Sequence, residues 1–166
     1  MVISGTASAG TQVALWRELP HQTSFHQLST TTADSAGAYK FTLKRGSVMT
    51  DQKWYVTSNG ARSATLAQQV DALVALASST RSTVVGRAIV LRGQVTPSHA
   101  GQRVLIEMSR GSSWQVIARP RLGHGSSYRV THRFVKSGAV KLRVVFRRDS
   151  RNAGSTSSTL TVNVKP

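Results

Sequence analysis

The sequence contains no cysteine, which removes a whole group of functions. Without thiols there is no disulfide bridge, no thiolate metal site and no cysteine nucleophile. Long apolar runs are missing as well. None approaches the ~18 residues that a membrane-spanning helix needs, so we expect no membrane insertion. The opening Met1-Val-Ile-Ser-Gly5 has neither the charged start nor the apolar stretch of a signal peptide.

Carboxylates are also scarce, since the 166 residues include only six Asp and Glu. They are Glu18, Asp34, Asp51, Asp71, Glu107 and Asp149. Acid–base catalysis needs titratable groups that converge on one substrate. No two of these carboxylates are close enough in sequence to indicate such a pair. We predict that the protein is not an enzyme, has no catalytic residues and uses no cofactor.

The five histidines have no spacing that is typical of a metal site. They are His21, His26, His99, His124 and His132. No two stand two or four residues apart, the separations that place two zinc ligands on one face of a strand or helix. We interpret them as exposed loop residues and predict no metal site.

Asp149 and Asn152 have a spacing that weakly resembles a calcium loop. The neighbouring Arg147, Arg148 and Arg151 would repel a cation, however, and acidic ligands are too few. We interpret the segment as a turn in which Asp149 and Asn152 cap backbone amides.

What the sequence does contain is a repeat. The matched positions include Gly5 with Gly93, Gly10 with Gly101, Val13 with Val104, Leu15 with Ile106, and Tyr39 with Tyr128. Phe25 falls near Trp114, and residues 63–70 align with 157–164 without a gap. Self-similarity of this kind indicates two copies of one module. We predict two domains, residues 1–70 and 71–166.

Both copies read as β-structure. Segments such as Tyr39–Leu43 and Leu160–Val164 alternate apolar and polar residues, which is typical of half-buried strands. Clusters of Gly, Ser, Asn and Asp separate these segments, and short strands joined by such turns favour an antiparallel sandwich. Residues 64–77 alone could form a helix, but the repeat matches them to a strand, so we expect strands there.

The second copy has a lead-in, Leu73–Gly86, before its matching strand at Ile89–Val95. The first copy begins at the matching strand itself. We therefore expect the sequence to be part of a longer protein and its first module to lack an opening strand, which would expose a sheet edge near Val2–Ser8.

The order of motifs in the second copy resembles bacterial immunoglobulin-like repeats of secreted and surface proteins, notably of actinobacteria. Those motifs are Val90-Leu-Arg-Gly-Gln-Val-Thr-Pro97, Gly111-Ser-Ser-Trp-Gln-Val116, Gly125-Ser-Ser-Tyr-Arg-Val130 and Leu142-Arg-Val-Val-Phe146. The resemblance implies two tandem immunoglobulin-like antiparallel β-sandwiches. It also implies an extracellular or cell-surface spacer, adhesive stalk or accessory module beside neighbouring domains of a longer parent protein, with no shared catalytic residues. We expect the chain to be a monomer.

Positive charge is concentrated in the second copy. Residues 1–72 hold six Lys and Arg against four carboxylates, a net charge of +2, whereas residues 73–166 hold sixteen against two, a net charge of +14. A field of this sign attracts polyanions. Strand alternation places several of these side chains on solvent faces, and arginine suits phosphate and carboxylate because its planar fork binds both oxygens.

The candidate polyanion-binding residues are Arg119, Arg121, Arg129, Arg133, Lys141, Arg143, Arg147, Arg148 and Arg151. If their strands are neighbours, they form one basic sheet face that binds nucleic acid, teichoic acid, acidic polysaccharide or other cell-wall components. The alternative is a solvated surface whose counter-charge comes from neighbouring domains. Aromatic residues at repeat-equivalent positions, Phe25 and Trp114 among them, are interpreted as core. Trp16 has no aromatic counterpart, and it is either an exposed stacking platform or partial packing.

Overall fold

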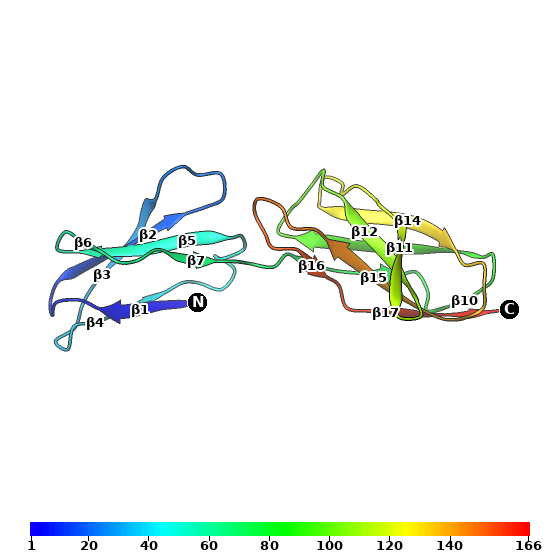
Figure 1. Cartoon of the computed structure of the whole chain (residues 1–166), viewed down its shortest axis with the longest axis horizontal. Coiled ribbons are helices and arrows are strands. Elements are labelled where there is room, and N and C mark those ends of the chain that lie inside the picture. The colour runs from blue at the N-terminus through cyan, green and yellow to red at the C-terminus, as the bar shows by residue number, and fades with distance from the viewer. The chain divides into compact units, whose positions relative to one another are not determined.

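The chain folds entirely as β-structure in a computed structural model that describes all 166 residues (Figure 1). It forms seventeen strands and no helix, hence none long and apolar enough to cross a membrane. The residues group into two compact units. Unit 1 comprises residues 1–70 and 150–153, and unit 2 comprises residues 71–149 and 154–166. The expectation that residues 64–77 form strands and not a helix is confirmed.

Unit 2 is a sandwich of two sheets. Its strands are β8 (Leu73–Val74), β9 (Ala77–Ser78), β10 (Ser82–Val84), β11 (Ala88–Thr96), β12 (Val104–Arg110), β13 (Ser113–Ala118), β14 (Ser127–Arg133), β15 (Gly138–Phe146), β16 (Ser155–Thr156) and β17 (Leu160–Lys165). One sheet has the order β14-β11-β8, with β9 also on β11. The other has the order β10-β17-β15-β12-β13, with β16 also on β15.

This strand order defines an immunoglobulin-like fold. The opening segment crosses between sheets, because β8 and β9 pair antiparallel with β11 whereas β10 pairs parallel with β17. The rest follows the immunoglobulin arrangement, in which second and fifth strands share one sheet and the third, sixth and seventh share the other. Alternate residues of β11, β12, β15 and β17 face inward and build an apolar core. Seventeen apolar residues are buried there.

Unit 1 repeats the later part of this plan. Its strands are β1 (Val2–Thr6), β2 (Gln12–Glu18), β3 (His26–Thr32), β4 (Ala38–Thr42), β5 (Gln52–Ser58), β6 (Ala61–Arg62) and β7 (Leu66–Gln68). One sheet is the pair β1-β4, and the other has the order β3-β2-β5-β6, with β7 also on β5. The buried apolar core consists of Val13, Leu15, Ala33, Phe41 and Trp54.

The repeat in the sequence becomes a repeat in strand pairing. Gly5 lies opposite Tyr39 on β1 and β4, as Gly93 lies opposite Tyr128 on β11 and β14. Leu15 lies opposite Val56 on β2 and β5, and this matches the pairing of β12 with β15 in unit 2. The two units are therefore tandem immunoglobulin-like β-sandwiches built on one register.

Candidate anion-binding faces of unit 2

The predicted basic residues do not form one field. Arg129 and Arg133 lie on β14, whereas Lys141 and Arg143 lie on β15, and these strands belong to different sheets. The condition for one basic sheet face, that these strands are neighbours, is therefore not met. In a sandwich the two sheets bury facing surfaces, so their solvent faces point in opposite directions. The chain crosses from one sheet to the other between β14 and β15, and this divides the basic residues.

On the β15 face, Arg143 is already engaged. Its Nε donates to Glu107 Oε2 at 2.8 Å, and its guanidinium carbon lies 4.1 Å from the centre of the Trp114 ring. The side chain is only 31% exposed. Arg143 therefore stabilises this surface through an ion pair and a cation–π contact. Its neighbours Lys141 and Arg147 are exposed.

Arg119 and Arg121 flank the connection after β13. Arg121 forms a β-bridge with Arg103, and its Nε donates to the Gly101 carbonyl oxygen at 2.7 Å. The Arg103 guanidinium in turn donates to the Arg119 carbonyl oxygen at 3.2 Å. All three side chains are exposed. The hydrogen bonds to backbone carbonyls position the Arg103 and Arg121 side chains but neutralise no charge.

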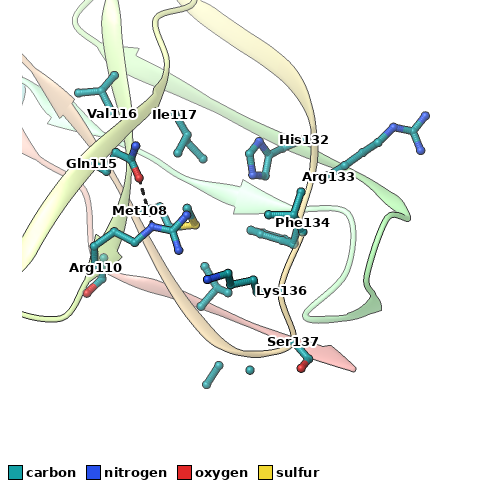
Figure 2. A pocket seen from close by; sticks show the side chains of 15 residues that line it. Met108, Arg110, Gln115, Val116, Ile117, His132, Arg133, Phe134, Lys136 and Ser137 are labelled. Carbon is teal, nitrogen blue, oxygen red and sulfur yellow. Dashed lines mark hydrogen bonds between the residues drawn. The ribbon is translucent and has the colours of Figure 1, made fainter. Parts of the chain in front are cut away.

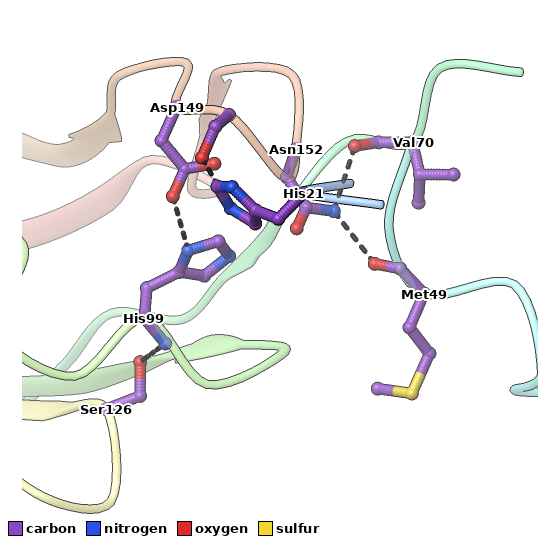
Figure 3. A network of polar contacts seen from close by, with 8 residues as sticks. His21, Met49, Val70, His99, Ser126, Asp149 and Asn152 are labelled. Atoms are coloured by element: carbon purple, nitrogen blue, oxygen red, sulfur yellow. Dashed lines mark hydrogen bonds and ion pairs between the residues drawn. The ribbon is translucent and has the colours of Figure 1, made fainter. Parts of the chain in front are cut away.

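Arg148 and Arg151 lie in the connection between β15 and β16, and Arg151 belongs to unit 1. The Arg151 carbonyl oxygen accepts a hydrogen bond from Asp51 N at 2.7 Å. Asn152 is fully buried, and its Nδ2 donates to the carbonyl oxygens of Met49 at 2.8 Å and Val70 at 3.0 Å (Figure 3). The interpretation that Asn152 caps backbone amides is thus wrong, because its amide group donates to carbonyls instead.

The most unusual basic feature was missed by the sequence analysis. Arg92 on β11 lies directly opposite Arg129 on β14. Since Val95 N donates to the Ser126 carbonyl oxygen, the hydrogen-bonded pairs fall at odd-numbered residues of β11, and Arg92–Arg129 is a non-hydrogen-bonded pair whose side chains are close. Both side chains are exposed, and neither has a hydrogen bond or an ion pair.

The alternation of Leu91, Arg92 and Val95 along the strand was the available signal, since it places Arg92 on the solvent face. The two arginines also edge a shallow depression of about 420 Å³ over Gly93, bordered on its other side by residues 75–77. Arg133 follows on the same face of β14. Like charges directly opposite each other destabilise a sheet, so an anion placed between them would be favoured.

A second hollow, the cleft of unit 2, lies beside β13 and β14 and has a volume of about 460 Å³ (Figure 2). Met108, Ile117 and Phe134 supply apolar lining. Figure 2 shows Arg110 and Lys136 extending over the cleft, while the Arg133 side chain points away and donates to the Gly86 carbonyl oxygen at 3.0 Å. The Arg110 Nε donates to Gln115 Oε1 at 3.1 Å.

His132 also lines this cleft and packs edge-on against Phe134, with ring centres 4.9 Å apart. Burial lowers the pKa of the His132 imidazole, which keeps the ring uncharged at neutral pH. Any attraction of this cleft for anions therefore comes from its arginine and lysine residues and not from His132.

The interpretation of the histidines as exposed loop residues is wrong for His99 as well as for the half-buried His132. The His99 side chain is fully buried, and its Nδ1 lies 2.8 Å from Asp149 Oδ2 (Figure 3). Its ring packs on Phe146, and its backbone N–H donates to Ser126 Oγ at 2.9 Å. The partners are fifty residues apart in sequence, so spacing could not reveal the pair. No three His, Asp or Glu side chains are grouped as metal ligands.

Phe25 and Trp114 were predicted as core, and both lie outside it. Trp114 lies beneath Arg143, and Phe25 packs on Tyr55 with ring centres 4.6 Å apart. Trp16 stacks on Tyr55 with ring centres 5.8 Å apart, and its Nε1 donates to Thr57 Oγ1 at 2.9 Å. Trp16 is thus partly packed against its neighbours and is not a free platform.

No family model matches the sequence, and no curated protein matches it. Among solved structures, the chain is similar to a tetra-tandem repeat in the extending region of a large adhesion protein, with 17% identity and a TM-score of 0.43 over 97% of this chain and 45% of that one. The chain is also similar to the D0-D1 domain of intimin, with 12% identity and a TM-score of 0.42 over 98% of this chain and 90% of that one. For invasin, a bacterial integrin-binding protein, the identity is 16% and the TM-score is 0.42, over 98% of this chain and 35% of that one.

The chain spans less than half the length of the adhesion-protein and invasin structures. At these TM-scores the likeness carries no inference about function. The class of the protein rests on its own strand order, which is that of tandem immunoglobulin-like sandwiches.

Proposed function

We propose that the chain is a non-catalytic pair of adhesive or structural modules from an extracellular bacterial protein. The observation that supports this is the content of the repeat. The two units share buried residues and strand register, whereas their outer faces carry different side chains. What is duplicated is therefore a scaffold and not a reactive site, and function in such folds lies in what each scaffold displays. The motifs of residues 90–146 resemble bacterial surface repeats in the same way.

The test is location on the cell. Antibodies raised against the chain are applied to intact and to permeabilised cells of the source organism. We expect equal labelling of both, and loss of the signal after brief protease treatment of intact cells. Labelling that requires permeabilisation would overturn the extracellular assignment.

A second candidate function is the binding of an acidic polymer, and the Arg92–Arg129 pair favours it. Two arginines directly opposite each other on neighbouring strands, with no ion-pair partner, cost stability, and Arg133 extends the same face. A chain of phosphates or carboxylates, such as nucleic acid, teichoic acid or acidic polysaccharide, would relieve that repulsion and engage each planar fork. Binding would release condensed counterions and fall steeply with salt.

The experiment compares two double variants with equal charge. Arg92→Ser with Arg129→Ser alters the β11–β14 face, and Lys141→Ser with Arg147→Ser alters the other sheet. Retention on heparin, DNA and teichoic acid columns is measured at low and physiological salt. We expect the first double variant to lose retention and the second to keep most of it. Equal loss in both would indicate non-specific charge. Elution of the unaltered protein below about 0.1 M salt would reject polymer binding, because only unscreened attraction operates there.

A further inference from the structure

Strand β1 of unit 1 is paired on one side only. It pairs with β4, and no strand lies on its other edge (Figure 1). Leu43 N donates to the Met1 carbonyl oxygen at 2.9 Å, and Ala7 N donates to the Gly37 carbonyl oxygen at 2.8 Å. Odd-numbered residues thus direct their backbone groups toward β4. The alternation of an antiparallel ladder then directs those of Val2, Ser4 and Thr6 to the open side.

In unit 2 the equivalent edge is filled. Ala75 N donates to the Gln94 carbonyl oxygen at 2.9 Å, and Ser79 N donates to the Val90 carbonyl oxygen at 2.8 Å. Counted from the Gly5–Gly93 match, Gln94 and Val90 correspond to Thr6 and Val2. Residues 73–79 of unit 2 therefore occupy the place that is open beside β1.

A tyrosine marks the same place in both units. In unit 2 the Tyr128 hydroxyl lies over Gly93 and donates to the Ala75 carbonyl oxygen at 2.7 Å. A Cβ at Gly93 would collide with that carbonyl oxygen and with the tyrosine ring. In unit 1 Tyr39 lies over Gly5 in the same way, but its hydroxyl has no hydrogen-bond partner and no chain covers the glycine. Unit 1 therefore has the glycine and the tyrosine of this arrangement, with the tyrosine hydroxyl free to donate a hydrogen bond.

A cleft of about 390 Å³ continues from this edge into unit 1. Ala7 borders it on the β1 side and Ala61 on the β6 side, with Val13 and Val56 among the lining residues. The corresponding space in unit 2 holds Ala72 and Val74, which are both buried. Val74 pairs with Val95, the counterpart of Ala7, and the Ala72 carbonyl oxygen accepts from Ser155 Oγ, which stands where Ala61 stands.

We propose that the open side of unit 1 binds an extended peptide strand with the pattern of residues 72–79, supplied by polypeptide outside residues 1–70. The strand pairs with Val2, Ser4 and Thr6, and offers a carbonyl oxygen to the Tyr39 hydroxyl. It also inserts two small or β-branched apolar side chains into the cleft, as Ala72 and Val74 do in unit 2. This is strand addition at a sheet edge, in which backbone bonds give affinity and the alternate side chains give specificity. It is independent of the proposed functions above.

The test uses the whole chain and a synthetic peptide of its own residues 71–86, with a scrambled peptide as control. Amide resonances and hydrogen exchange are followed by NMR during titration. We expect saturable shifts and new protection at Val2, Ser4 and Thr6 with the native peptide alone. No saturable change there, or equal change with the scrambled peptide, would overturn the proposal, as would changes confined to unit 2.

Two proline variants give a matched pair. Ser4→Pro removes an N–H that faces the open side, whereas Thr30→Pro removes one on the free edge of β3. The Thr30 N–H faces away from β2, since Ala33 N bonds to the Thr11 carbonyl oxygen and the ladder alternates from there. We expect Ser4→Pro to weaken peptide binding at least roughly tenfold and Thr30→Pro to leave it unchanged. Equal effects would overturn the proposal.

Tyr39→Phe provides a variant that keeps the fold, because its hydroxyl has no partner to lose. We expect weaker peptide binding with an unchanged melting temperature of the free chain. Sedimentation of the free chain completes the test. Self-association through β1 that the peptide does not reverse would assign the edge to a second copy and reject the peptide strand.

Discussion

At one pair of positions the two units differ completely on a shared backbone. Trp16 lies opposite Tyr55 on β2 and β5, and the corresponding pair on β12 and β15 is Glu107 opposite Arg143. Unit 1 stacks two rings there, and unit 2 forms an ion pair at 2.8 Å. Cross-strand pairs of either kind stabilise a sheet by similar small amounts. The register is therefore set by the buried residues, and the outer face is left free to change.

Each unit adds an aromatic ring to this pair, and unit 1 also adds an arginine. Phe25 and Arg62 join the stack in unit 1, where the Arg62 guanidinium carbon lies 3.8 Å from the centre of the Tyr55 ring. In unit 2 Trp114 lies under Arg143. These surface clusters explain why Phe25 and Trp114 match in the repeat without belonging to a core.

The largest expected difference between the units lies in their cores. Trp54 and Leu142 occupy equivalent positions, and both are almost fully buried. Trp54→Ala costs about 3–5 kcal/mol and Leu142→Ala about 2–5 kcal/mol. Unit 1 has five buried apolar residues and unit 2 has seventeen, so we expect Trp54→Ala to unfold its unit and Leu142→Ala only to lower a transition.

Residue-resolved hydrogen exchange in urea distinguishes the two outcomes for these core variants. Loss of protection confined to unit 1 is expected for Trp54→Ala. Equal, partial loss in both units would contradict the comparison of core sizes.

The next comparison removes one hydroxyl from each unit. Tyr128→Phe deletes the hydrogen bond to the Ala75 carbonyl oxygen and should cost about 1 kcal/mol of unfolding free energy in unit 2. Tyr39→Phe deletes no hydrogen bond and should leave unit 1 unchanged. Denaturant unfolding of the two variants measures both values. A cost in unit 1 equal to that in unit 2 would mean that Tyr39 has a partner of its own.

How far the sequence could predict these features depends on how far apart along the chain the interacting residues lie. Strand alternation and the self-match correctly indicated two β-sandwiches, because both signals are local or repeated. They also placed Arg129 and Arg143 on solvent faces. Alternation fixes the face of a strand, however, and not the sheet that the strand joins, so the separation of β14 from β15 was beyond it.

Two long-range features were hidden for a related reason. His99 pairs with Asp149, a partner fifty residues away whose contact exists only after folding. Residues 150–153 lie within the second copy of the repeat in sequence, yet they pack within unit 1, where Asn152 donates to two backbone carbonyls. Neither a composition nor a spacing distinguishes such a segment from an ordinary turn.

A smaller difference in stability is expected from the charges on the outer faces of the two units. Where unit 2 sets Arg92 against Arg129, unit 1 sets Ser4 against Lys40. We expect Arg129→Thr to raise the unfolding free energy of unit 2 by about 0.2–1 kcal/mol at low salt, because like-charge repulsion is relieved. Lys40→Thr is the control and should change little. Thermal unfolding at low and high salt measures the gain. A gain that salt does not reduce would show that the repulsion is not electrostatic.

The smallest effect concerns pH. Burial lowers the pKa of His132, so the unfolded chain binds this proton more tightly than the folded one. The stability contributed by the neutral ring is present above the unfolded pKa of about 6.5 and is lost as pH decreases below it. The cause of the lowered pKa is burial of the imidazole in the cleft.

We therefore expect unit 2 to melt lower at pH 5 than at pH 7, and His132→Gln to reduce that difference. The melting temperature of unit 1 is the internal reference. A difference between the two pH values that survives the substitution would assign the effect to another group.

The parallel pairing of β10 with β17 has a mechanical consequence. Ser82–Val84 lie beside Asn163–Lys165. Along the chain, these neighbouring segments are the first and the last strands of their sheet. If unit 2 is pulled from both sides along the chain, the two strands are drawn in opposite directions along their axes. Their hydrogen bonds are then sheared together and not opened one at a time. Unit 1 has no such pair, since β1 bonds to β4 and β7 to β5. Under tension unit 1 should extend first, while unit 2 holds to higher force.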